Sequence, residues 1–160
     1  MTIAAGDTIP EATFKQFTKD GMKDVPSSEI FDGKKVVLFA VPGAFTPTCS
    51  DVHLPGFITR ASDLEAKGVD VVACVAVNDA FVLASWRKAR AIPDKIQLLA
   101  DGNGEFTRAM GLELDARGFG MGTRSRRYAA IVDNGKVTYI GVEPGKEVGA
   151  SSADAVLKYL

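Results

Sequence analysis

Apolar residues are arranged along the chain in short continuous runs that are separated by amphipathic segments. The runs Lys35–Val41, Val69–Val77 and Ile96–Ala100 are rich in β-branched residues and have the length of strands. Such runs are typical of strands buried on both faces of a parallel sheet, since a strand with one exposed face would show alternating polar residues. The chain is therefore expected to contain a buried central sheet.

Amphipathic segments between these runs predict helices. The longest, Asp51–Lys67, is expected to kink at Pro55. A second helix is expected over residues 78–90, where an Asn-Asp pair can cap its first turn, and a short one over Glu105–Met110. Two serines at the start of the segment 27–33 are expected to cap a further short turn. Strands and helices thus alternate, as they do in α/β proteins.

Two hairpins are predicted near the ends of the chain. Residues 12–17 and 22–25 flank an Asp-Gly turn, and residues 127–132 and 136–142 flank a turn that contains Asn-Gly. These dipeptides favour the tight turns of hairpins. Ser151 is expected to cap a closing helix. The predicted fold class is α/β, with a central mixed sheet flanked by helices on both faces and an N-terminal β-hairpin.

Length and charge narrow the classes of function. A chain of 160 residues is expected to form one domain, residues 1–160, whose core needs neither disulfides nor metals. Nineteen basic residues stand against 20 acidic ones, so there is no cationic excess for binding nucleic acid. No apolar run approaches the roughly 18 residues of a membrane span, and the first residues do not resemble a signal peptide. We therefore expect a cytoplasmic protein without nucleic-acid or membrane partners.

The segment 42–50 carries the clearest signal for chemistry. It joins the end of a buried strand to the start of a helix, which is where open α/β sheets keep their sites. Cys49 is expected in the first helical turn, where unpaired N–H groups and the helix dipole favour a thiolate. The alternative is that Cys49 is a small apolar residue packed beneath a loop. Because two prolines and a threonine constrain the loop, the sequence favours the reactive thiol.

His53 lies four residues after Cys49, on the same helical face. This spacing is compatible with a Cys–His nucleophile pair, with a partial metal site completed by Cys74, or with a structural histidine that is buried or next to the substrate. Three candidate ligands without a zinc spacing make the metal site the weakest of these interpretations, and we expect no metal. Cys74 lies within an apolar run and is expected to be a buried strand residue.

Ordered motifs along almost the whole chain resemble those of the type II, or type V, peroxiredoxins. They comprise the segments 42–50 and 53–57, Cys74 with 77–81, and the segments 101–106 and 124–129. The ordered set is much more specific than the Pro-x-x-x-Thr-x-x-Cys motif alone. The resemblance implies a thioredoxin-like fold and the reduction of hydrogen peroxide and organic hydroperoxides by a thiol donor.

The resemblance also implies a role for several residues. Cys49 matches the peroxidatic thiol, which attacks one peroxide oxygen and becomes a sulfenic acid. Thr46 matches the hydroxyl that bonds thiolate and peroxide, and Pro42 matches the residue that shields the sulfur. Arg127 matches the family's distant arginine, whose permanent charge stabilises the thiolate and the leaving oxygen. His53 is assigned to the substrate pocket.

Partners follow from the same resemblance. One branch of the family carries a resolving cysteine near the C-terminus, but residues 149–152 contain none. The Pro-Thr-Cys form of the motif resembles the plant- and bacterial-like branch, which is commonly reduced by glutathione with glutaredoxin or by thioredoxin, and glutathione with glutaredoxin is the reductant that we expect. Thioredoxin, acting through Cys74 as a resolving thiol, is the alternative, and no cofactor is expected. A homodimer is expected to form near Phe45 and Phe119, because comparable residues lie at a dimer interface in the family.

Two other classes of function remain open. One is a thioredoxin-like binding or chaperone module whose thiols are incidental, although such a scaffold would not need Thr46, Cys49 and Arg127 together. The other is a Cys–His hydrolase or acyltransferase. That interpretation lacks a recognisable orienting partner for the histidine, and a loop bounded by prolines suits a very small substrate.

Overall fold

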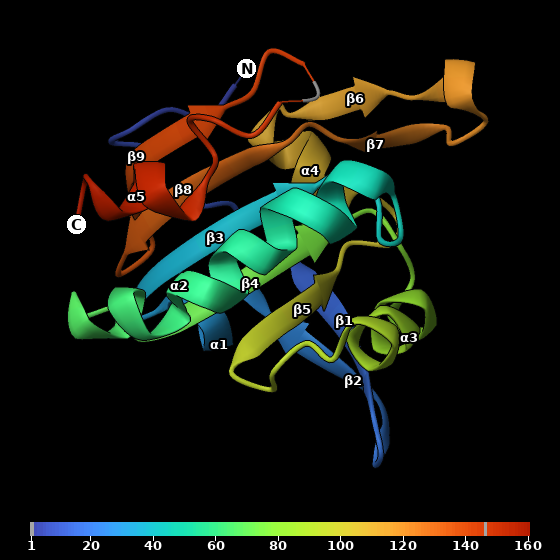
Figure 1. The fold of residues 1–160 in the computed structure, drawn as a ribbon, viewed down its shortest axis with the longest axis horizontal. Helices are drawn as coiled ribbons and strands as arrows, with labels where there is room; N and C mark the ends of the chain where they lie inside the picture. The colour runs from blue at the N-terminus through green and yellow to red at the C-terminus, as the bar shows by residue number, and fades with distance from the viewer. Residues whose placement is uncertain (1, 146) are drawn as a thin grey trace.

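The structure is a computed structural model that describes residues 2–145 and 147–160. Its centre is a mixed sheet made of seven strands (Figure 1). They are β1 (Thr13–Thr18), β2 (Gly21–Pro26), β3 (Lys35–Val41), β4 (Val71–Ala76), β5 (Ile96–Ala100), β8 (Tyr128–Asp133) and β9 (Lys136–Val142). The spatial order is β2-β1-β5-β4-β3-β8-β9, with β3, β4 and β5 parallel and the outer pairs antiparallel.

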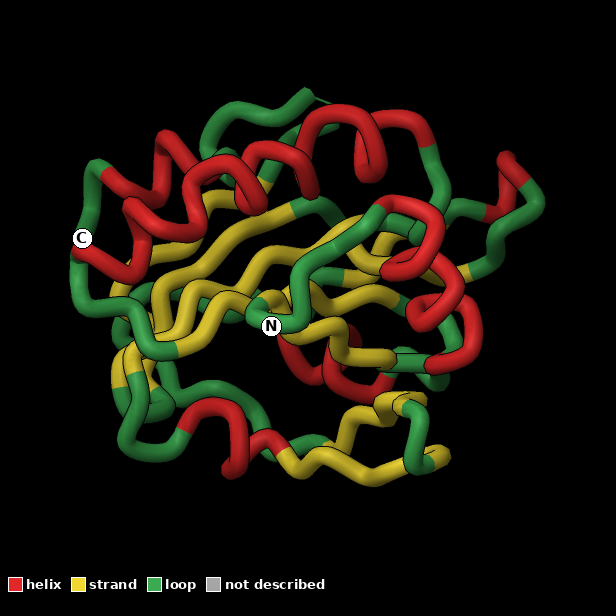
Figure 2. Tube along the Cα trace, turned by 60° about the horizontal axis from the view of Figure 1, so that its bottom comes forward, coloured by secondary structure: helices red, strands yellow, loops and turns green. Residues whose placement is uncertain are grey.

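Helices cover both faces of this sheet (Figure 2). They are α1 (Ser27–Phe31), α2 (Leu54–Ala66), α3 (Ala80–Arg90), α4 (Glu105–Met110) and α5 (Ala153–Leu157). α2, α3 and α5 pack on one face, and α1 and α4 on the other. No helix in the described part of the chain is long and apolar enough to span a membrane.

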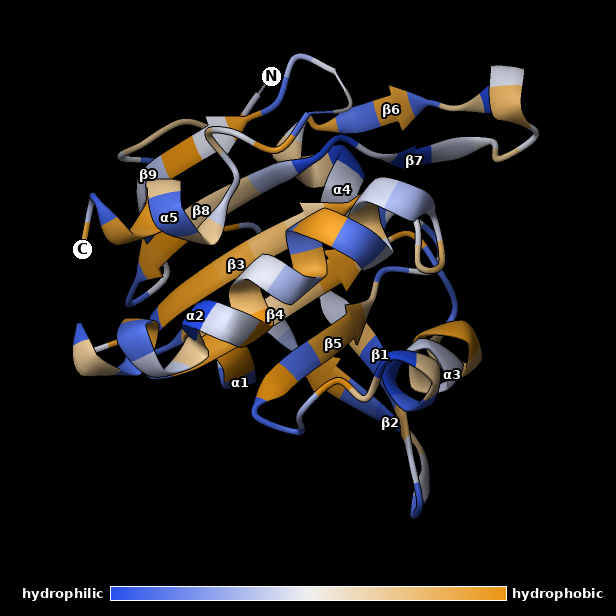
Figure 3. Cartoon of the chain, in the orientation of Figure 1, coloured by the Kyte–Doolittle hydropathy of each residue, from blue (hydrophilic) through white to orange (hydrophobic). Residues whose placement is uncertain are grey.

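The central strand β3 explains why the sequence folds in this way. Its residues alternate between the two cores, with Val37 and Phe39 on the α2 side and Val36 and Leu38 on the α1 side. All four side chains are fully buried, and Figure 3 shows β3 as hydrophobic along most of its length. The predicted bounds of β3, β5 and α4 are confirmed, as are the two hairpins and the helices on both faces.

Two predicted helix caps are wrong. Pro26, not a serine, is the N-cap of α1, and the Ser27 hydroxyl instead accepts a hydrogen bond from the Ala12 N–H at 3.1 Å. The cap of α5 is Ser152, which accepts from the N–H of residue 155, while Ser151 is held by other partners described below. In both cases the serine that the local sequence pattern assigned to the helix cap forms hydrogen bonds with another part of the chain instead.

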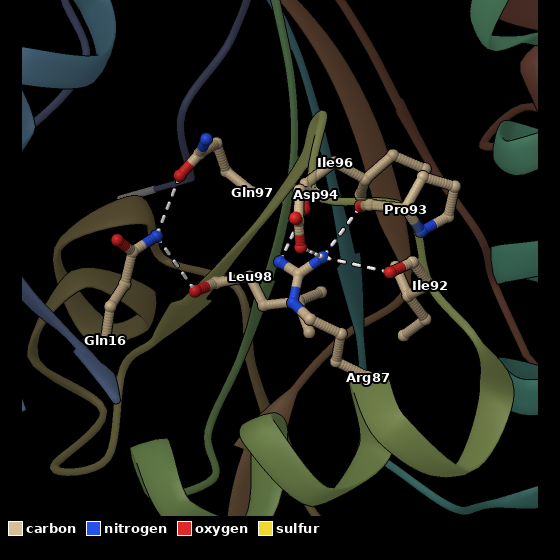
Figure 4. A network of polar contacts seen from close by, with 8 residues as sticks. All are labelled: Gln16, Arg87, Ile92, Pro93, Asp94, Ile96, Gln97 and Leu98. Atoms are coloured by element: carbon tan, nitrogen blue, oxygen red, sulfur yellow. Dashed lines mark hydrogen bonds and ion pairs between the residues drawn. The ribbon is translucent and has the colours of Figure 1, made fainter. Parts of the chain in front are cut away.

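The turn after α3 is fixed by Arg87 (Figure 4). Its guanidinium donates to the carbonyl oxygens of Ile92, Pro93 and Ile96 at 3.2, 2.7 and 2.7 Å. These bonds tie the end of α3 to the start of β5, so α3 is held against the sheet. A groove of about 950 Å³ lies between α3 and β1, and its lining does not include Cys49.

Candidate active site

The chain leaves β3 at Val41 and enters a π-helical segment, η1 (Cys49–His53), which leads directly into α2. The N–H of Leu54 bonds to the Cys49 carbonyl, five residues back. Pro55 follows in the first turn of α2 and has no N–H to donate to η1, in keeping with a change of helical pattern here. In place of the expected kink at Pro55, the structure has a π-helical turn just before it. Such turns are frequent at functional sites.

The loop before Cys49 is fixed by short-range and long-range hydrogen bonds. The Thr46 hydroxyl donates to the Gly43 carbonyl at 2.7 Å, and the Ser50 N–H donates to the Thr46 carbonyl at 2.9 Å. From the neighbouring strand–helix junction, the Asn78 side chain accepts from the Ala44 N–H at 2.9 Å. The loop therefore has a defined conformation before any substrate arrives.

Helix α3 braces η1 from the side. The indole N–H of Trp86 donates to the Ser50 hydroxyl at 3.0 Å, in a fully buried contact. Arg90 forms an ion pair with Asp51 at 3.2 Å on the surface. Sequence patterns did not predict these contacts, because partners about 40 residues apart on two helices leave no local signal.

Arg127 meets the thiol inside the protein. Its Nη2 lies 3.1 Å from the Cys49 sulfur, although 78 residues separate them in the sequence. Cys49 is fully buried, and Arg127 is only 5% exposed. The pair meets because Arg127 directly precedes β8, which pairs with β3 in the sheet. The Nε of Arg127 is buried and has no hydrogen-bond partner among the described residues.

His53 accepts a hydrogen bond from the other terminal nitrogen of the Arg127 guanidinium. The Nη1 of Arg127 lies 2.9 Å from the His53 Nδ1. Arginine can only donate, so Nδ1 carries the lone pair and Nε2 carries the proton, which is donated to the Ser151 carbonyl at 2.8 Å. Burial lowers the pKa of His53 to about 4, and the Arg127 charge acts in the same direction. The ring packs edge-on against Phe39 and Phe57.

The assignment of His53 to the substrate pocket stays a prediction, since the structure shows only where its side chain is held. The imidazole is 1% exposed and touches Arg127 rather than the thiol. Thr46 lies in the loop beside Cys49, but its hydroxyl hydrogen points to a backbone carbonyl. Pro42 is half-buried at the end of β3, where its carbonyl accepts a bond from Arg124 at 3.4 Å.

Cys74 is a buried residue of β4, as predicted. Its side chain belongs to the same apolar cluster as Cys49, and both thiols are free. Burial raises the pKa of the Cys74 thiol, and the nearby Cys49 adds to this rise. Within residues 2–145 and 147–160 no group of three or more His, Cys, Asp or Glu side chains could hold a metal ion.

A two-stranded ribbon that the sequence did not predict lies beside the loop. It consists of β6 (Glu113–Asp115) and β7 (Thr123–Ser125), joined through a short 3₁₀ helix, η2 (Arg117–Phe119). Arg124 donates to the carbonyls of Met121 and Pro42 and so connects the ribbon to the loop. Phe45 and Phe119, on the loop and the ribbon, are 47% and 73% exposed.

Comparisons with known proteins agree with this geometry. A family model described as Redoxin matches residues 4–157. Peroxiredoxin-2C of Arabidopsis thaliana is 48% identical over 99% of this chain and 98% of its own length. The chloroplastic Peroxiredoxin-2E of the same plant is 49% identical over 99% of this chain and 70% of its length.

Solved structures show the same relationship. A crystal structure of reduced Prx3 from Vibrio vulnificus in complex with H2O2 superposes with a TM-score of 0.94, at 55% identity and with 99% of each chain covered. The peroxiredoxin 5 of Alvinella pompejana gives a TM-score of 0.86 at 37% identity, covering 98% of this chain and 96% of that one. These neighbours confirm the thioredoxin-like fold expected from the resemblance. The chain belongs to the Redoxin family and, within it, to the type II, or type V, peroxiredoxins.

Proposed function

We propose that Cys49 is the peroxidatic thiol of this thiol peroxidase and that glutathione, with glutaredoxin, returns it to the reduced state. The observation that carries the proposal is the contact between Cys49 and Arg127, 3.1 Å long and shielded from water. A guanidinium keeps its charge at any physiological pH, so it favours the thiolate over the thiol. Buried charge-assisted contacts of this kind are stronger than exposed ones.

The proposed first step is a two-electron displacement. The Cys49 thiolate attacks one peroxide oxygen and forms an S–O bond while the O–O bond breaks. The other oxygen leaves with the electron pair, takes up a proton and departs as water or an alcohol. The sulfur is oxidised to a sulfenic acid, and the peroxide is reduced.

Neighbouring groups support this step. The unpaired Nε of Arg127 is a buried donor that can meet negative charge on the reacting oxygens. The Thr46 hydroxyl gives its hydrogen to Gly43, so its oxygen can accept a hydrogen bond from the peroxide O–H. Pro42, which matches the residue that shields the sulfur in the family, would add a rigid wall without an N–H.

The proposed recycling step uses an external thiol. Glutathione attacks the sulfenic acid and forms a mixed disulfide, with loss of water, and glutaredoxin then takes over the glutathionyl group. The burial of Cys74 inside β4 supports this route, because a resolving thiol must approach Cys49 with the geometry of a disulfide.

Replacement of the two central residues tests the proposal. Cys49→Ser should abolish peroxide consumption without unfolding the protein. Arg127→Gln should slow it by a factor on the order of 10²–10³, as loss of one oxyanion-hole donor does in other enzymes. Arg108→Gln, on the surface of α4, is the control and should keep the parent rate. Unchanged turnover in Cys49→Ser would show that another group carries the reaction.

Reductant assays test the recycling step. Peroxide consumption should be faster with glutathione and glutaredoxin than with thioredoxin and its reductase, and Cys74→Ser should keep most of the glutathione-dependent turnover. Mass spectrometry after one equivalent of peroxide plus glutathione should place the adduct on Cys49. A quantitative Cys49–Cys74 disulfide, with turnover lost in Cys74→Ser, would instead identify Cys74 as the resolving thiol.

We also propose that two copies associate through the surface around Phe45 and Phe119. Phe45 has a φ of 67°, an unfavourable conformation for a bulky residue, and about half of its side chain faces solvent. Light scattering should give the mass of a dimer, and Phe45→Asp should give that of a monomer. A parent protein that stays monomeric at micromolar concentration would contradict this.

A further inference from the structure

Glu143 is a buried carboxylate just after β9, and its Oε2 holds the segment that leads into α5. This one oxygen accepts three hydrogen bonds, from the Gly149 N–H at 2.6 Å, the Ser151 N–H at 2.8 Å and the Ser151 hydroxyl at 2.5 Å. Burial opposes ionisation of Glu143, but the donors of Ser151 and Gly149 together hold its pKa below the ordinary value. The carboxylate is therefore an ionised clamp on the backbone of residues 149–151.

Further contacts fix the same segment to the end of β9. The Tyr139 hydroxyl donates to the Ala150 carbonyl at 2.7 Å. A Cβ added to Gly141 would lie 2.4 Å from that carbonyl oxygen, so the two backbones are in close contact. The N–H of Glu143 also donates to the Arg127 carbonyl at 2.9 Å. Glu143 thus holds both the backbone of Arg127 and the segment 149–151, which faces His53.

The clamp determines which way the Ser151 carbonyl points. Both donors of Ser151, its N–H and its hydroxyl, are bound to Glu143, so its carbonyl is left to accept the Nε2 proton of His53. That bond keeps the lone pair on Nδ1, where Arg127 donates. With the proton on Nδ1 instead, two donors would face each other, and the guanidinium would lose a partner.

A groove on the surface at His53 explains why the segment that precedes α5 must be held in place. A groove of about 300 Å³ runs along the seam between α2 and the segment 148–154, and His53 forms part of its wall. If that segment separated from α2, water would compete for the imidazole N–H. The Glu143 carboxylate, which directly follows β9, holds the segment in place through the backbone N–H groups of Gly149 and Ser151.

We propose that Glu143 is a positioning residue of the peroxidase site, which acts through Ser151 and His53 on the guanidinium that faces Cys49. The proposal rests on the proposed function of Arg127 and Cys49. A carboxylate suits this position because an ionised oxygen can accept several donors at once, whereas a glutamine offers one carbonyl oxygen and adds two N–H donors. The negative charge is not required at the sulfur, which Glu143 does not contact.

The test compares Glu143→Ala and Glu143→Gln with Glu147→Ala. Glu147 is an exposed acid two residues before Gly149 and serves as the control. Nitrogen-15 NMR of the ring of His53, the only histidine, reports the tautomer directly. The pH midpoint of iodoacetamide alkylation at Cys49 reports how well the thiolate is stabilised. In the Glu143 variants we expect a mixture of tautomers, a midpoint moved to higher pH, and peroxide turnover reduced by roughly 10- to 100-fold, the range seen when outer-shell partners of metal ligands are removed.

A purely structural role predicts a different result. Glu143→Ala would then lower the unfolding temperature but leave the His53 tautomer and the alkylation midpoint at parent values, and this outcome would overturn the proposal. If Glu143→Ala does not fold, Ser151→Ala removes one of the three donors and should shift both readouts in the same direction by less. A parent protein that consumes no peroxide would refute the proposed function, while the tautomer and the alkylation midpoint would still decide the role of Glu143.

Discussion

Moderate acid, between pH 7 and pH 5, should already destabilise this protein, because its only histidine is buried in the neutral form. His53 has a pKa of about 4 in the folded protein against 6.5 in an unfolded chain. Between these two values the unfolded chain binds a proton that the folded protein excludes. Stability must therefore fall as the pH decreases from 6.5 to about 4 and must level off below that, as far as His53 is concerned.

The size of the effect follows from the same two values. At about 1.4 kcal/mol per pKa unit, the full shift corresponds to about 3 kcal/mol, of which about 2 kcal/mol is lost between pH 7 and pH 5. Glu143 contributes to the pH dependence only at lower pH. Because its pKa is lowered in the folded protein, its stabilising effect is retained at pH values above the ordinary pKa of 4.5 and is lost only as the pH falls below that value. The window from pH 7 to pH 5 therefore isolates the histidine.

Urea denaturation at pH 7, 6 and 5 measures this loss. Trp86 is the only tryptophan and is buried, so its fluorescence reports unfolding. The free energy of unfolding should fall by about 2 kcal/mol in the parent protein over this range. In His53→Gln it should stay nearly constant, whatever its value at pH 7. Parallel pH dependence in the two proteins would refute a neutral, buried His53.

Two further changes test the packing around the site. Trp86→Phe removes the indole N–H whose hydrogen bond Ser50 accepts. It should lower the free energy of unfolding, measured by circular dichroism, by about 1–2 kcal/mol. An unchanged denaturation midpoint would show that this contact between α3 and η1 does not stabilise the protein. Gly141→Ala would place a methyl group against the Ala150 carbonyl and should cost about 1–3 kcal/mol and slow peroxide turnover. Gly56→Ala, on α2 with nothing within 4 Å of the added Cβ, is the matched control and should be neutral or stabilising; equal losses in both variants would contradict the close contact.

The parts of the fold that local patterns encode were predictable. The strand β3 and the β8–β9 hairpin each carry their signal within fewer than 20 residues, as apolar runs or turn dipeptides. The β6–β7 ribbon was not predictable, because its strands have three residues each and show no periodicity. The fold class was recoverable because the sheet depends on the long runs, and the ribbon adds nothing to the main core.

Prediction of the site was limited by long-range contacts. Cys49 was identifiable from its strand–loop–helix context, whereas nothing local to Arg127 indicated that it would reach a thiol 78 residues away; only the family motif did so. Ser151 was assigned to a helix cap because capping rules consider only residues that are close in sequence. Such rules do not consider the carboxylate of Glu143, which follows β9 and binds the Ser151 hydroxyl. Residues whose role depends on a partner from another element need the structure.

The geometry also bears on the choice between a Cys–His pair and a thiolate held by a cation, which the sequence left open. A general base needs a free lone pair next to the proton that it removes. The His53 Nδ1 lone pair is occupied by Arg127, and its Nε2 carries a proton bound to a carbonyl, so neither nitrogen can take a proton from Cys49. A pKa of about 4 makes the imidazole a weak base as well. What faces the sulfur is a permanent cation, which stabilises a thiolate without proton transfer. That arrangement suits a peroxide, whose reduction needs an ionised sulfur and a stabilised leaving oxygen, better than an acyl group, whose transfer needs a base that also returns the proton.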